Sequence, residues 1–435
     1  MVKSVILVNE HYHDTKPTSI IALDKLSGIT LLERHLRTLK NCGVQTTIII
    51  PPPNAPENAR TISDQIADPK ERVRVVDQKN TISEFNEDDT VLLVAGHYYI
   101  EKPLIDHIIK FSNPSLLIDS TTPNCDDKAF SSNVPNAPVG CALISYKTLQ
   151  ALLKNDHLRW QDLLPHLTLD ENTQQLDIEE IPSYKHNIRR HRRSMWMQIN
   201  RKSDCGIAHS LVIDSAQKGS LDLPAQLLHA PIENYIVSKL CNTSATPNQI
   251  TLITNIAAWT VTWGILSGYL WLSLIGAAFV GIMDGLDGKL ARAKIKTSKV
   301  GELEHIFDMM FEYSWWLSLG WVLGGGNIDS PTFMAGVALV LLNFTDSITG
   351  VGFWFLLGKT HTRILDNYTP LDLAVRKVSG RRNIYIWLLL LTGPMWGLTI
   401  ALWVCVWWGI ATIIVRGGRA LWLIGSQQAP QKFRF

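Results

Sequence analysis

Acidic side chains gather in two short segments of the chain, each beside small residues and next to a long apolar run. Asp284 and Asp287 lie in the first segment, and the second begins at Gly301 after a short basic stretch. On a helix, residues three or four apart share a face, so Asp284 and Asp287 are expected to point together. By the same spacing, the second helix would present one polar stripe, formed by Gly301, Glu304, His305, Asp308 and Glu312.

This pattern predicts divalent-metal chemistry on phosphates. Carboxylates near membrane depth are costly unless they are paired or bind a metal. Clustered oxygen ligands suit Mg²⁺ or Mn²⁺, and such ions bind phosphates. In the alternative, the acids only pair with Lys289, Arg292 or Lys299 at a solvated helix end. Gly288 and Ala291 favour the metal site, because small residues one turn apart let a nucleotide approach the backbone closely.

Long uncharged runs must position these segments. Residues 249–283 and 383–415 contain no Asp, Glu, Lys or Arg, and about 20 apolar residues already cross a bilayer. Of the 15 tryptophans, only Trp160 and Trp196 precede residue 249, and membrane interfaces favour this residue. A purely soluble enzyme and a disordered chain are therefore excluded. We predict an all-α domain of six membrane spans at residues 250–268, 270–286, 302–325, 331–357, 383–396 and 398–416.

The charges of the loops predict the orientation of these spans. Fifteen Lys and Arg residues lie within 289–299, 358–382 and the segment after residue 415, whereas the three opposite turns contain none. The positive-inside rule then places both termini and the soluble domain in the cytoplasm of a bacterial or archaeal type of cell membrane. The lipid bilayer is thus an expected partner, and nucleic acid is not. The six cysteines are scattered, so we expect neither a disulfide framework nor a cysteine zinc site.

Residues 1–204 read as an α/β domain. Short β-branched runs at 5–8, 46–50, 73–76 and 90–94 alternate with helical patterns at 31–41 and 102–111, which is typical of a mostly parallel, Rossmann-like sheet. Residues 205–248 read as a linker. Within it, residues 231–241 predict an amphipathic helix on the membrane surface, and an ordinary linker helix fits equally well. The six-span domain would occupy 249–425, followed by a cytoplasmic tail at 426–435.

The spacing D-x2-D-G-x2-A-R-x8-G resembles the signature of the CDP-alcohol phosphotransferases, also called phosphatidyltransferases. The matching residues are Asp284, Asp287, Gly288, Ala291, Arg292 and Gly301, and the resemblance covers roughly residues 231–425. It implies a membrane transferase with two divalent ions, Mg²⁺ or Mn²⁺, that bridge the pyrophosphate of a CDP-alcohol donor. The donor would lie against Gly288, Ala291, Arg292 and Gly301, and an alcohol or alcohol-phosphate acceptor would displace CMP. Such reactions belong to phospholipid or inositol-phosphate biosynthesis, and the family also implies a homodimer.

The chain departs from this family after the second glycine. The family places aspartates four and eight residues later, where this sequence has His305 and Met309. In one interpretation, Glu304 and Asp308 form the second acidic pair in a shifted register. In another, His305 becomes a metal ligand and Asp308 or Glu312 activates the acceptor, since imidazole can serve as ligand or base. The third is a non-catalytic membrane protein that binds lipid head groups or nucleotide. The candidate metal ligands are thus Asp284, Asp287, Glu304, His305 and Asp308, and the candidate bases are Asp308, His305 and Glu312.

Basic residues before the fifth span are candidates for binding the acceptor. Arginine binds phosphate oxygens bidentately, so Arg381 and Arg382 could hold an acceptor phosphate together with Arg376 and Lys377. The Arg-Arg pair resembles the branch of the family that uses inositol-phosphate acceptors. In the alternative, these basic residues only fix the orientation of the spans in the membrane and bind no ligand. Asp346, inside the fourth span, would either face the cavity or bond to a neighbouring helix.

The N-terminal domain has a strand at residues 5–8, Lys16-Pro17 and the segment LLERHLRTLKNCGV at 31–44. By these features it resembles the nucleotidyltransferases of sugar-nucleotide type, in the domain order of bifunctional inositol-phosphate cytidylyltransferase/di-inositol phosphate synthases. That family has a Gly-rich loop after the first strand, where residues 9–14 here contain no glycine. Its metal-binding aspartates are replaced by His97 and by Gln198 or Asn200. We therefore expect a degenerate domain that acts as a scaffold, sensor or docking module. The alternatives are a domain that makes the CDP-activated donor from CTP, and a transition-metal site at His11, His13 and His97.

Overall fold

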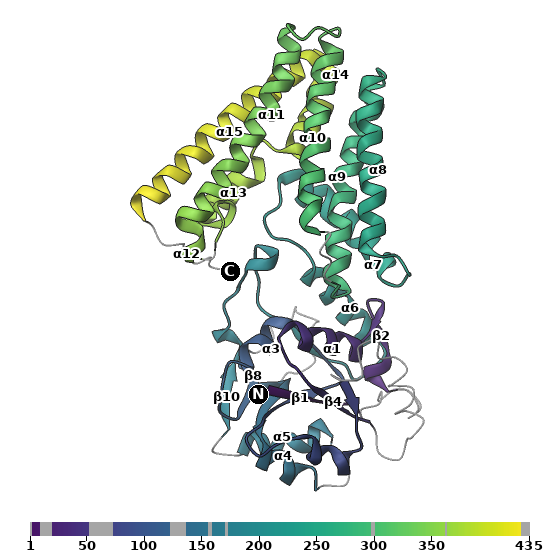
Figure 1. Ribbon diagram of the computed structural model, residues 1–435, viewed down its shortest axis with the longest axis vertical. Coiled ribbons are helices and arrows are strands. Elements are labelled where there is room, and N and C mark those ends of the chain that lie inside the picture. Colours follow the sequence, from purple (N-terminus) through teal and green to yellow (C-terminus); the bar gives the residue numbers. More distant parts are fainter. Residues whose placement is uncertain are drawn as a thin grey trace. The chain divides into compact units, whose positions relative to one another are not determined.

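The computed structural model describes two compact units of the chain. The described residues are 2–8, 20–51, 73–121, 136–154, 159–169, 173–296, 301–361 and 363–427, without the side chains of 301–306. One unit comprises Met1–Ser183 and Arg192–Ser215, and the other comprises Tyr184–His191 and Ala216–Phe435 (Figure 1). The segment Tyr184–His191 thus belongs to the second unit, although it lies within residues 1–204.

A seven-stranded sheet forms the centre of the first unit, in the order β10-β8-β9-β6-β1-β4-β5. Its strands are β1 (Val2–Leu7), β4 (Thr47–Ile50), β5 (Val73–Val75), β6 (Thr90–Ala95), β8 (Ser115–Asp119), β9 (Ala137–Ser145) and β10 (Gln174–Asp177). Strands β6, β1, β4 and β5 are parallel, and β9 runs antiparallel to both of its neighbours. The predicted α/β domain with a mostly parallel sheet is confirmed.

Helices cover both faces of this sheet, with α1 and α3 on one side and α4 and α5 on the other (Figure 1). The helices are α1 (Leu31–Asn41), α3 (Lys102–Ile108), α4 (Tyr146–Leu152), α5 (Trp160–Leu169) and α6 (Asp204–Ser215), and the short strands are β2 (Lys25–Leu26), β3 (Ile29–Thr30), β7 (Tyr98–Ile100) and β13 (Trp196–Gln198). Every residue of β4 and β8 is buried. Such uninterrupted burial is expected where helices cover both faces of a sheet, and it explains the apolar runs in the sequence.

The second unit is helical. Its helices are α7 (Ala230–Cys241), α8 (Pro247–Leu266), α9 (Leu270–Ala293), α10 (Gly301–Leu323), α11 (Pro331–Phe353), α12 (Lys359–His361), α13 (Pro370–Val378), α14 (Arg382–Trp396) and α15 (Leu398–Ser426). Helices α8 to α11, α14 and α15 fall at the six predicted ranges. Within the described part of the chain, three helical segments are long and apolar enough to cross a membrane, namely Leu270–Ala293, Pro331–His361 and Leu398–Ser426. The helical C-terminal domain is confirmed, and a count of six spans stays a prediction.

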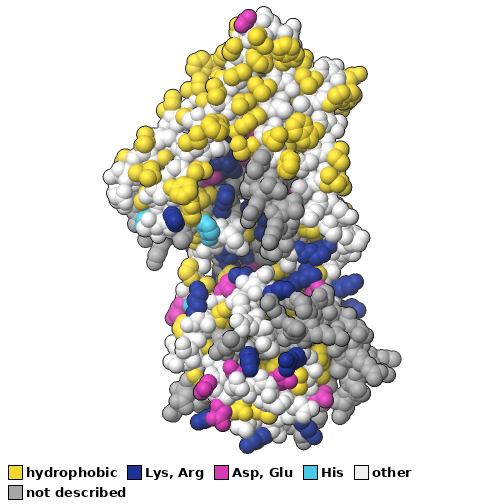
Figure 2. Space-filling model, in the orientation of Figure 1, with side chains coloured by type: hydrophobic (Ala, Val, Ile, Leu, Met, Phe, Trp, Pro, Cys, Tyr) yellow, Lys and Arg dark blue, Asp and Glu magenta, His cyan; other side chains and the backbone are white. Residues whose placement is uncertain are grey.

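Local sequence signals set the ends of these helices. Thr246 caps α8 in a capping box with Gln249, in which the Thr246 amide donates to Gln249 Oε1 at 2.9 Å, and Pro247 opens the helix. Ser330 caps α11, and Gly397, with a φ of 85°, allows the sharp turn from α14 into α15. Apolar side chains gather on the outside of the helical unit (Figure 2), as expected for helices that face lipid.

Candidate active site

A cavity of about 980 Å³ lies within the second unit. Carboxylates of α9 and α10 line one part of it, namely Asp284, Asp308 and Glu312. Four arginines line another part, namely Arg376 of α13, Arg381 just before α14, Arg382 of α14 and Arg416 of α15. Opposite charges thus share one cavity of a size that accommodates small-molecule ligands.

The two aspartates of α9 have different surroundings. Asp284 lines the cavity, and its Oδ2 accepts a hydrogen bond from Arg382 Nη2 at 2.6 Å. Asp287 is only 4% exposed, and its Oδ2 accepts from Thr251 Oγ1 at 2.5 Å. The backbone N–H of Gly288 donates to Asp287 Oδ1 at 2.5 Å. Asp287 is therefore held by neutral donors, whereas Asp284 faces a cation.

The basic residues that follow on α9 contact the segment before α8. Lys289 is 1% exposed, and its Nζ lies 2.9 Å from Glu233 Oε2 and donates to Asn234 Oδ1 at 2.8 Å. Arg292 Nε donates to the backbone oxygen of Ala216 at 2.7 Å. Burial raises the pKa of Glu233, and the charge of Lys289 partly offsets this effect. Lys289 pairs with Glu233 in these contacts, and Lys299 lies outside the described residues. The alternative that the basic residues pair with Asp284 and Asp287 stays a prediction.

On α10, Asp308 and Glu312 both line the cavity, one turn apart. Glu312 Oε1 accepts hydrogen bonds from Asn343 Nδ2 at 3.0 Å and from Trp316 Nε1 at 3.4 Å. Met309, at the position of the missing family aspartate, lines the cavity too. The side chains of the candidates Glu304 and His305, and the surroundings of Gly301, lie outside the described residues.

The predicted metal ligands fit a divalent cation by their chemistry, since carboxylate oxygens are the donors that Mg²⁺ and Mn²⁺ prefer. Asp284, Asp287 and Asp308 supply such oxygens from two helices. Among the described side chains, no three His, Cys, Asp or Glu residues lie together as a metal-binding group. A complete ligand set would therefore draw on α10 residues whose side chains are outside the described part of the chain.

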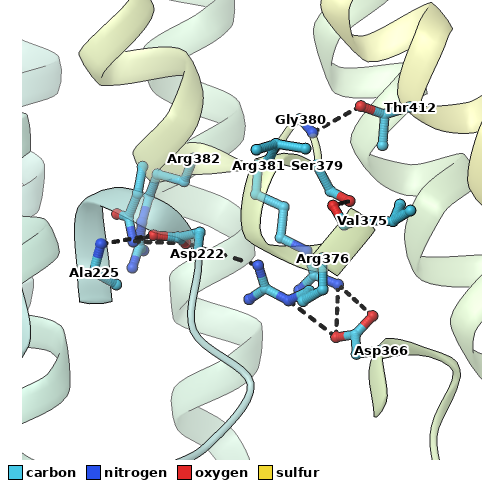
Figure 3. A network of polar contacts seen from close by, with 12 residues as sticks. Asp222, Ala225, Asp366, Val375, Arg376, Ser379, Gly380, Arg381, Arg382 and Thr412 are labelled. Atoms are coloured by element: carbon cyan, nitrogen blue, oxygen red, sulfur yellow. Dashed lines mark hydrogen bonds and ion pairs between the residues drawn. The ribbon is translucent and has the colours of Figure 1, made fainter. Parts of the chain in front are cut away.

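Asp366, in the turn η7 (Leu365–Asn367), is the centre of the arginine side (Figure 3). Its carboxylate lies 2.7 Å from Arg416 Nη1, and it accepts from Arg376 Nε and Arg381 Nη2, each at 3.1 Å. Burial by itself would raise the pKa of Asp366, but the three arginines outweigh burial and hold the pKa well below its usual range. Asp366 is therefore ionised at neutral pH and orients three guanidinium groups.

Asp346 of α11 extends this network. Its Oδ1 accepts from Arg416 Nε at 2.7 Å, and its Oδ2 lies 3.7 Å from Arg381 Nη2. Asp346 therefore bonds to a neighbouring helix and also lines the cavity, the two interpretations that the sequence left open. Asp222 closes the network at the other end, where Asn383 Nδ2 donates to its Oδ2 at 3.1 Å.

Two arginine nitrogens of this network are buried without a hydrogen-bond partner among the described residues. They are Nη1 of Arg376 and Nε of Arg381. Arg376 is 8% exposed, and its Nη1 lies 3.9 Å from Asp222 Oδ2, beyond hydrogen-bonding distance. A buried donor without a partner is costly, so both nitrogens are suited to an anionic ligand. Lys377, which was also a candidate, is not among the residues that line the cavity.

The sequence did not indicate Asp222, Asp366 or Arg416 as site residues. They come from a linker, a loop turn and the interior of the last helix, so no spacing connects them. The hairpin residues His186, Asn187 and Arg189 also line the cavity and were not predicted. The only available signal was the coincidence of acidic and basic residues in otherwise apolar surroundings.

In the first unit, strand pairing brings two predicted positions together. Strands β7 and β13 pair antiparallel, and Gln198 Nε2 lies 3.4 Å from Nε2 of His97. His97 is buried and makes an edge contact with Tyr98. Asn200 follows β13, and its amide N–H donates to Asp204. His11, His13 and the loop at 9–14 lie outside the described residues.

Residues 244–415 match the family model of the CDP-alcohol phosphatidyltransferases. The bifunctional IPC transferase and DIPP synthase of Archaeoglobus fulgidus is 30% identical over 123 residues, which are 27% of this chain and 24% of that protein. The protein of the same name from Thermococcus kodakarensis is 29% identical over 154 residues, 34% of this chain and 33% of that protein. The aligned part thus spans about a quarter to a third of the length of these curated relatives.

Solved structures are similar to part of the chain. The inositol-1-phosphate CTP transferase from T. maritima has 9% sequence identity and a TM-score of 0.35, and the match covers 47% of this chain and 94% of that one. HddC from Yersinia pseudotuberculosis has 14% identity and a TM-score of 0.35, with 48% and 99% covered.

Proposed function

Since residues 244–415 carry a CDP-alcohol phosphatidyltransferase domain, we propose that the chain is an integral membrane transferase. It would move a substituted phosphate from a CDP-alcohol to an alcohol or alcohol-phosphate acceptor and release CMP. The observation that carries the proposal is the cavity of the helical unit, where the carboxylates of α9 and α10 share one space with five arginines. Six spans, a cytoplasmic orientation of both termini and a homodimer belong to this proposal.

The carboxylate side would bind the donor. A divalent ion held by Asp284, Asp287 and ligands from α10 would neutralise the pyrophosphate and stabilise the departing CMP. The ligands from α10 would be Asp308 with Glu304 or His305. The Arg292 side chain lies against Gly288, where a Cβ would be 3.1 Å from Arg292 Nη1, and the nucleotide would lie over the surface that these two residues form. Ala291, Arg292 and Gly301 complete the donor surface that we propose.

The reaction needs one proton acceptor. The acceptor oxygen bonds to the phosphorus that carries the donor's alcohol, the bond from this phosphorus to the CMP oxygen breaks, and the hydroxyl proton passes to a carboxylate. Glu312 Oε1 already accepts hydrogen bonds from Asn343 and Trp316. We therefore assign the base to Asp308, with Glu312 and His305 as the alternatives.

The arginine side would bind the acceptor. Nη1 of Arg376 and Nε of Arg381 are buried donors suited to phosphate oxygens. Arg382 donates to Asp284, so it would connect the acceptor phosphate to the carboxylate side. An alcohol phosphate is therefore the acceptor class that we propose, in keeping with relatives named for IPC and DIPP.

A second candidate function is synthesis of the donor from CTP by the first unit. The bifunctional names of the two relatives favour it. His97 and Gln198 disfavour it, because neither supplies the carboxylate that a nucleotidyltransferase metal site requires. Release of pyrophosphate from CTP with sugar or inositol phosphates would establish this second activity.

The test of the main proposal is CMP release by the purified full chain with a panel of CDP-alcohols and acceptors. We expect turnover that depends on Mg²⁺ or Mn²⁺ and disappears with EDTA. Asp287→Asn should abolish it, and Asp329→Asn, the same change in an exposed turn, should not. Binding of nucleotide or lipid without CMP release from any donor would instead support the non-catalytic alternative.

A further inference from the structure

A hairpin outside the matched family domain forms part of the cavity wall. Strand β11 (Tyr184–Lys185) pairs antiparallel with β12 (Arg190–His191), and the 3₁₀ turn η4 (His186–Ile188) joins them. Arg189 ends this turn in the left-handed region, with a φ of 51°. The hairpin precedes residue 244, where the family match begins. It is therefore an addition of this chain to the transferase cavity.

The backbone of the hairpin is fixed to the helical unit. Asn367, which is 1% exposed, donates from Nδ2 to Tyr184 Oη at 3.0 Å and to the backbone oxygen of Arg189 at 3.2 Å. The amide of Gly219 donates to the backbone oxygen of Ile188 at 2.9 Å. A Cβ on Gly219 would lie 2.6 Å from the backbone oxygen of Arg189, so only glycine permits this approach.

Aromatic contacts add to this anchoring. The His186 ring stacks on Trp354 with 5.4 Å between centroids. The Arg363 guanidinium lies 4.9 Å from the centroid of the Tyr184 ring, which is the geometry of a cation–π contact. The hairpin is thus a preorganised wall.

The side chains of the turn face the cavity. His186, Asn187 and Arg189 are exposed, and all three line the cavity. Arg189 makes no ion pair with any residue that the structure describes. In contrast, Arg376, Arg381 and Arg416 already share the carboxylates of Asp366 and Asp346. Arg189 therefore adds a positive charge that is available to a ligand.

The hairpin borders the arginine side of the cavity. Asn367, which holds the hairpin, directly follows Asp366, which holds the arginines. Asp346, Gly350 and Trp354 lie four residues apart and line the cavity, so they form one stripe from the arginine network to the His186 ring. A molecule seated at Arg376 and Arg381 would therefore extend toward Arg189.

We propose that the hairpin Tyr184–His191 is an acceptor-specificity element, in which Arg189, His186 and Asn187 bind a second polar or anionic group of the acceptor. The inference rests on the proposed function and narrows it. The acceptor is a phosphorylated polyol, with its phosphate or a hydroxyl edge at the hairpin, and not an apolar lipid alcohol.

The test compares Arg189→Gln with Arg190→Gln, the same change at a neighbouring hairpin residue that does not line the cavity. The probes are glycerol 3-phosphate and inositol 1-phosphate, each beside its unphosphorylated polyol, with the full chain in detergent. Arg189→Gln should raise the KM of the phosphorylated acceptors about tenfold, the loss expected for one charge-assisted hydrogen bond. The KM of the CDP donor and kcat should stay as in the wild type. Arg190→Gln should leave all three constants unchanged.

Binding without turnover separates this inference from the proposed function. Stabilisation of the full chain against heat by glycerol 3-phosphate should weaken in Arg189→Gln even if no donor is turned over. Asn187→Asp places a negative charge on the same wall and should weaken phosphate binding more than glycerol binding. A rise in the donor KM, or equal effects of Arg189→Gln and Arg190→Gln, would overturn the inference. Absence of CMP release with intact, Arg189-dependent phosphate binding would overturn only the transferase assignment.

Discussion

The two sides of the cavity treat charge in different ways. On the arginine side, Asp366 and Asp346 join Arg376, Arg381 and Arg416 in one network of ion pairs. On the carboxylate side, Asp284 has a cation only because Arg382 reaches across. Asp287, three residues along the same helix, does not line the cavity and is held by neutral donors in the contacts described above. The arginine side is therefore organised by the protein itself, whereas the carboxylate side has excess negative charge for an incoming cation.

This difference in charge suits the two substrates of the proposed reaction, the CDP-alcohol donor and the phosphorylated acceptor. Preformed ion pairs fix the arginine side chains before a ligand arrives, so less conformational entropy is lost on binding. Arg382 is the one arginine that the contacts described above give to Asp284, and a bound divalent cation would neutralise more of the negative charge on this side. Substitutions on the carboxylate side should therefore mainly lower turnover, whereas substitutions on the arginine side should mainly lower the stability of the helical unit.

The largest effect is expected on the carboxylate side. Asp308→Asn should lower kcat by about 10²–10⁴-fold, the range for loss of a general base, and should also raise the KM of the donor, because Asp308 is a proposed metal ligand as well. Adding Met309→Asp should restore part of the turnover, because it returns a carboxylate to the family position. Quenched-flow measurement of CMP release tests both variants. If Asp308→Asn keeps full activity and Glu312→Gln loses it, the general base is Glu312, one turn further along α10, and not Asp308.

Asp366→Asn should break the arginine side. Three guanidinium groups would then lose their shared counter-charge, and breaking a buried ion pair costs about 3–5 kcal/mol of unfolding free energy. Thermal or denaturant unfolding of the full chain in detergent measures this loss. The exposed acid Asp329 offers the control Asp329→Asn, for which no change is expected. A loss below about 1 kcal/mol would mean that the network does not stabilise the helical unit.

The stability of the first unit and the stability of the helical unit should depend on pH in different ways. Burial lowers the pKa of His35 in α1 to about 4, and the charge of Arg34 adds to this effect. The unfolded chain therefore binds the proton first, and about 3 kcal/mol of stability, present above pH about 6.5, should be lost as the pH falls toward 4. The contribution of Asp366 to stability has a different pH range. Because the pKa of Asp366 is depressed in the folded state, this contribution is present above pH about 4 and is lost only as the pH falls below that value.

Hydrogen exchange at pH 7 and pH 5 would measure this difference. Amides of α1 should lose protection at pH 5, and amides of α13 should keep it. His35→Gln should remove the pH dependence of α1. Equal loss of protection in both helices would contradict the assignment to His35.

The smallest effect is expected from the neutral support of Asp287. Thr251→Val removes the hydroxyl that donates to Asp287 Oδ2 and should weaken activation by Mg²⁺ about tenfold, the lower limit for loss of a group that orients a metal ligand. Thr260→Val is the matched control, because among the described residues Thr260 bonds only to its own helix, at the backbone oxygen of Ile256, and is exposed. A Mg²⁺ titration of CMP release compares the two variants. Equal titration curves would show that Thr251 does not orient the ligand.

The fold was largely predictable, because local patterns encode it. Apolar runs with few charges gave the helices α8 to α11, α14 and α15, and the β-branched runs gave β1, β4, β5 and β6. The carboxylate side was predictable for the same reason, because Asp284 and Asp287 are three residues apart on one helix. The positions of Glu304 and His305 remain predictions, since their side chains lie outside the described residues.

The arginine side and the hairpin were not predictable. Asp222, Asp366 and Arg416 come together only when four segments pack. The hairpin Tyr184–His191 lies in sequence between the two segments of the first unit but packs on η7 and Trp354 of the second. Neither feature has a spacing or a period that a sequence pattern could indicate.

The sequence by itself determined which helices form and which of them carry acidic stripes, because hydrophobic period and residue spacing act within one element. Only the tertiary structure decided which charges neutralise one another and which remain for a ligand. That choice depends on distances between elements far apart in the chain, and electrostatic energy in a buried site changes steeply with such distances.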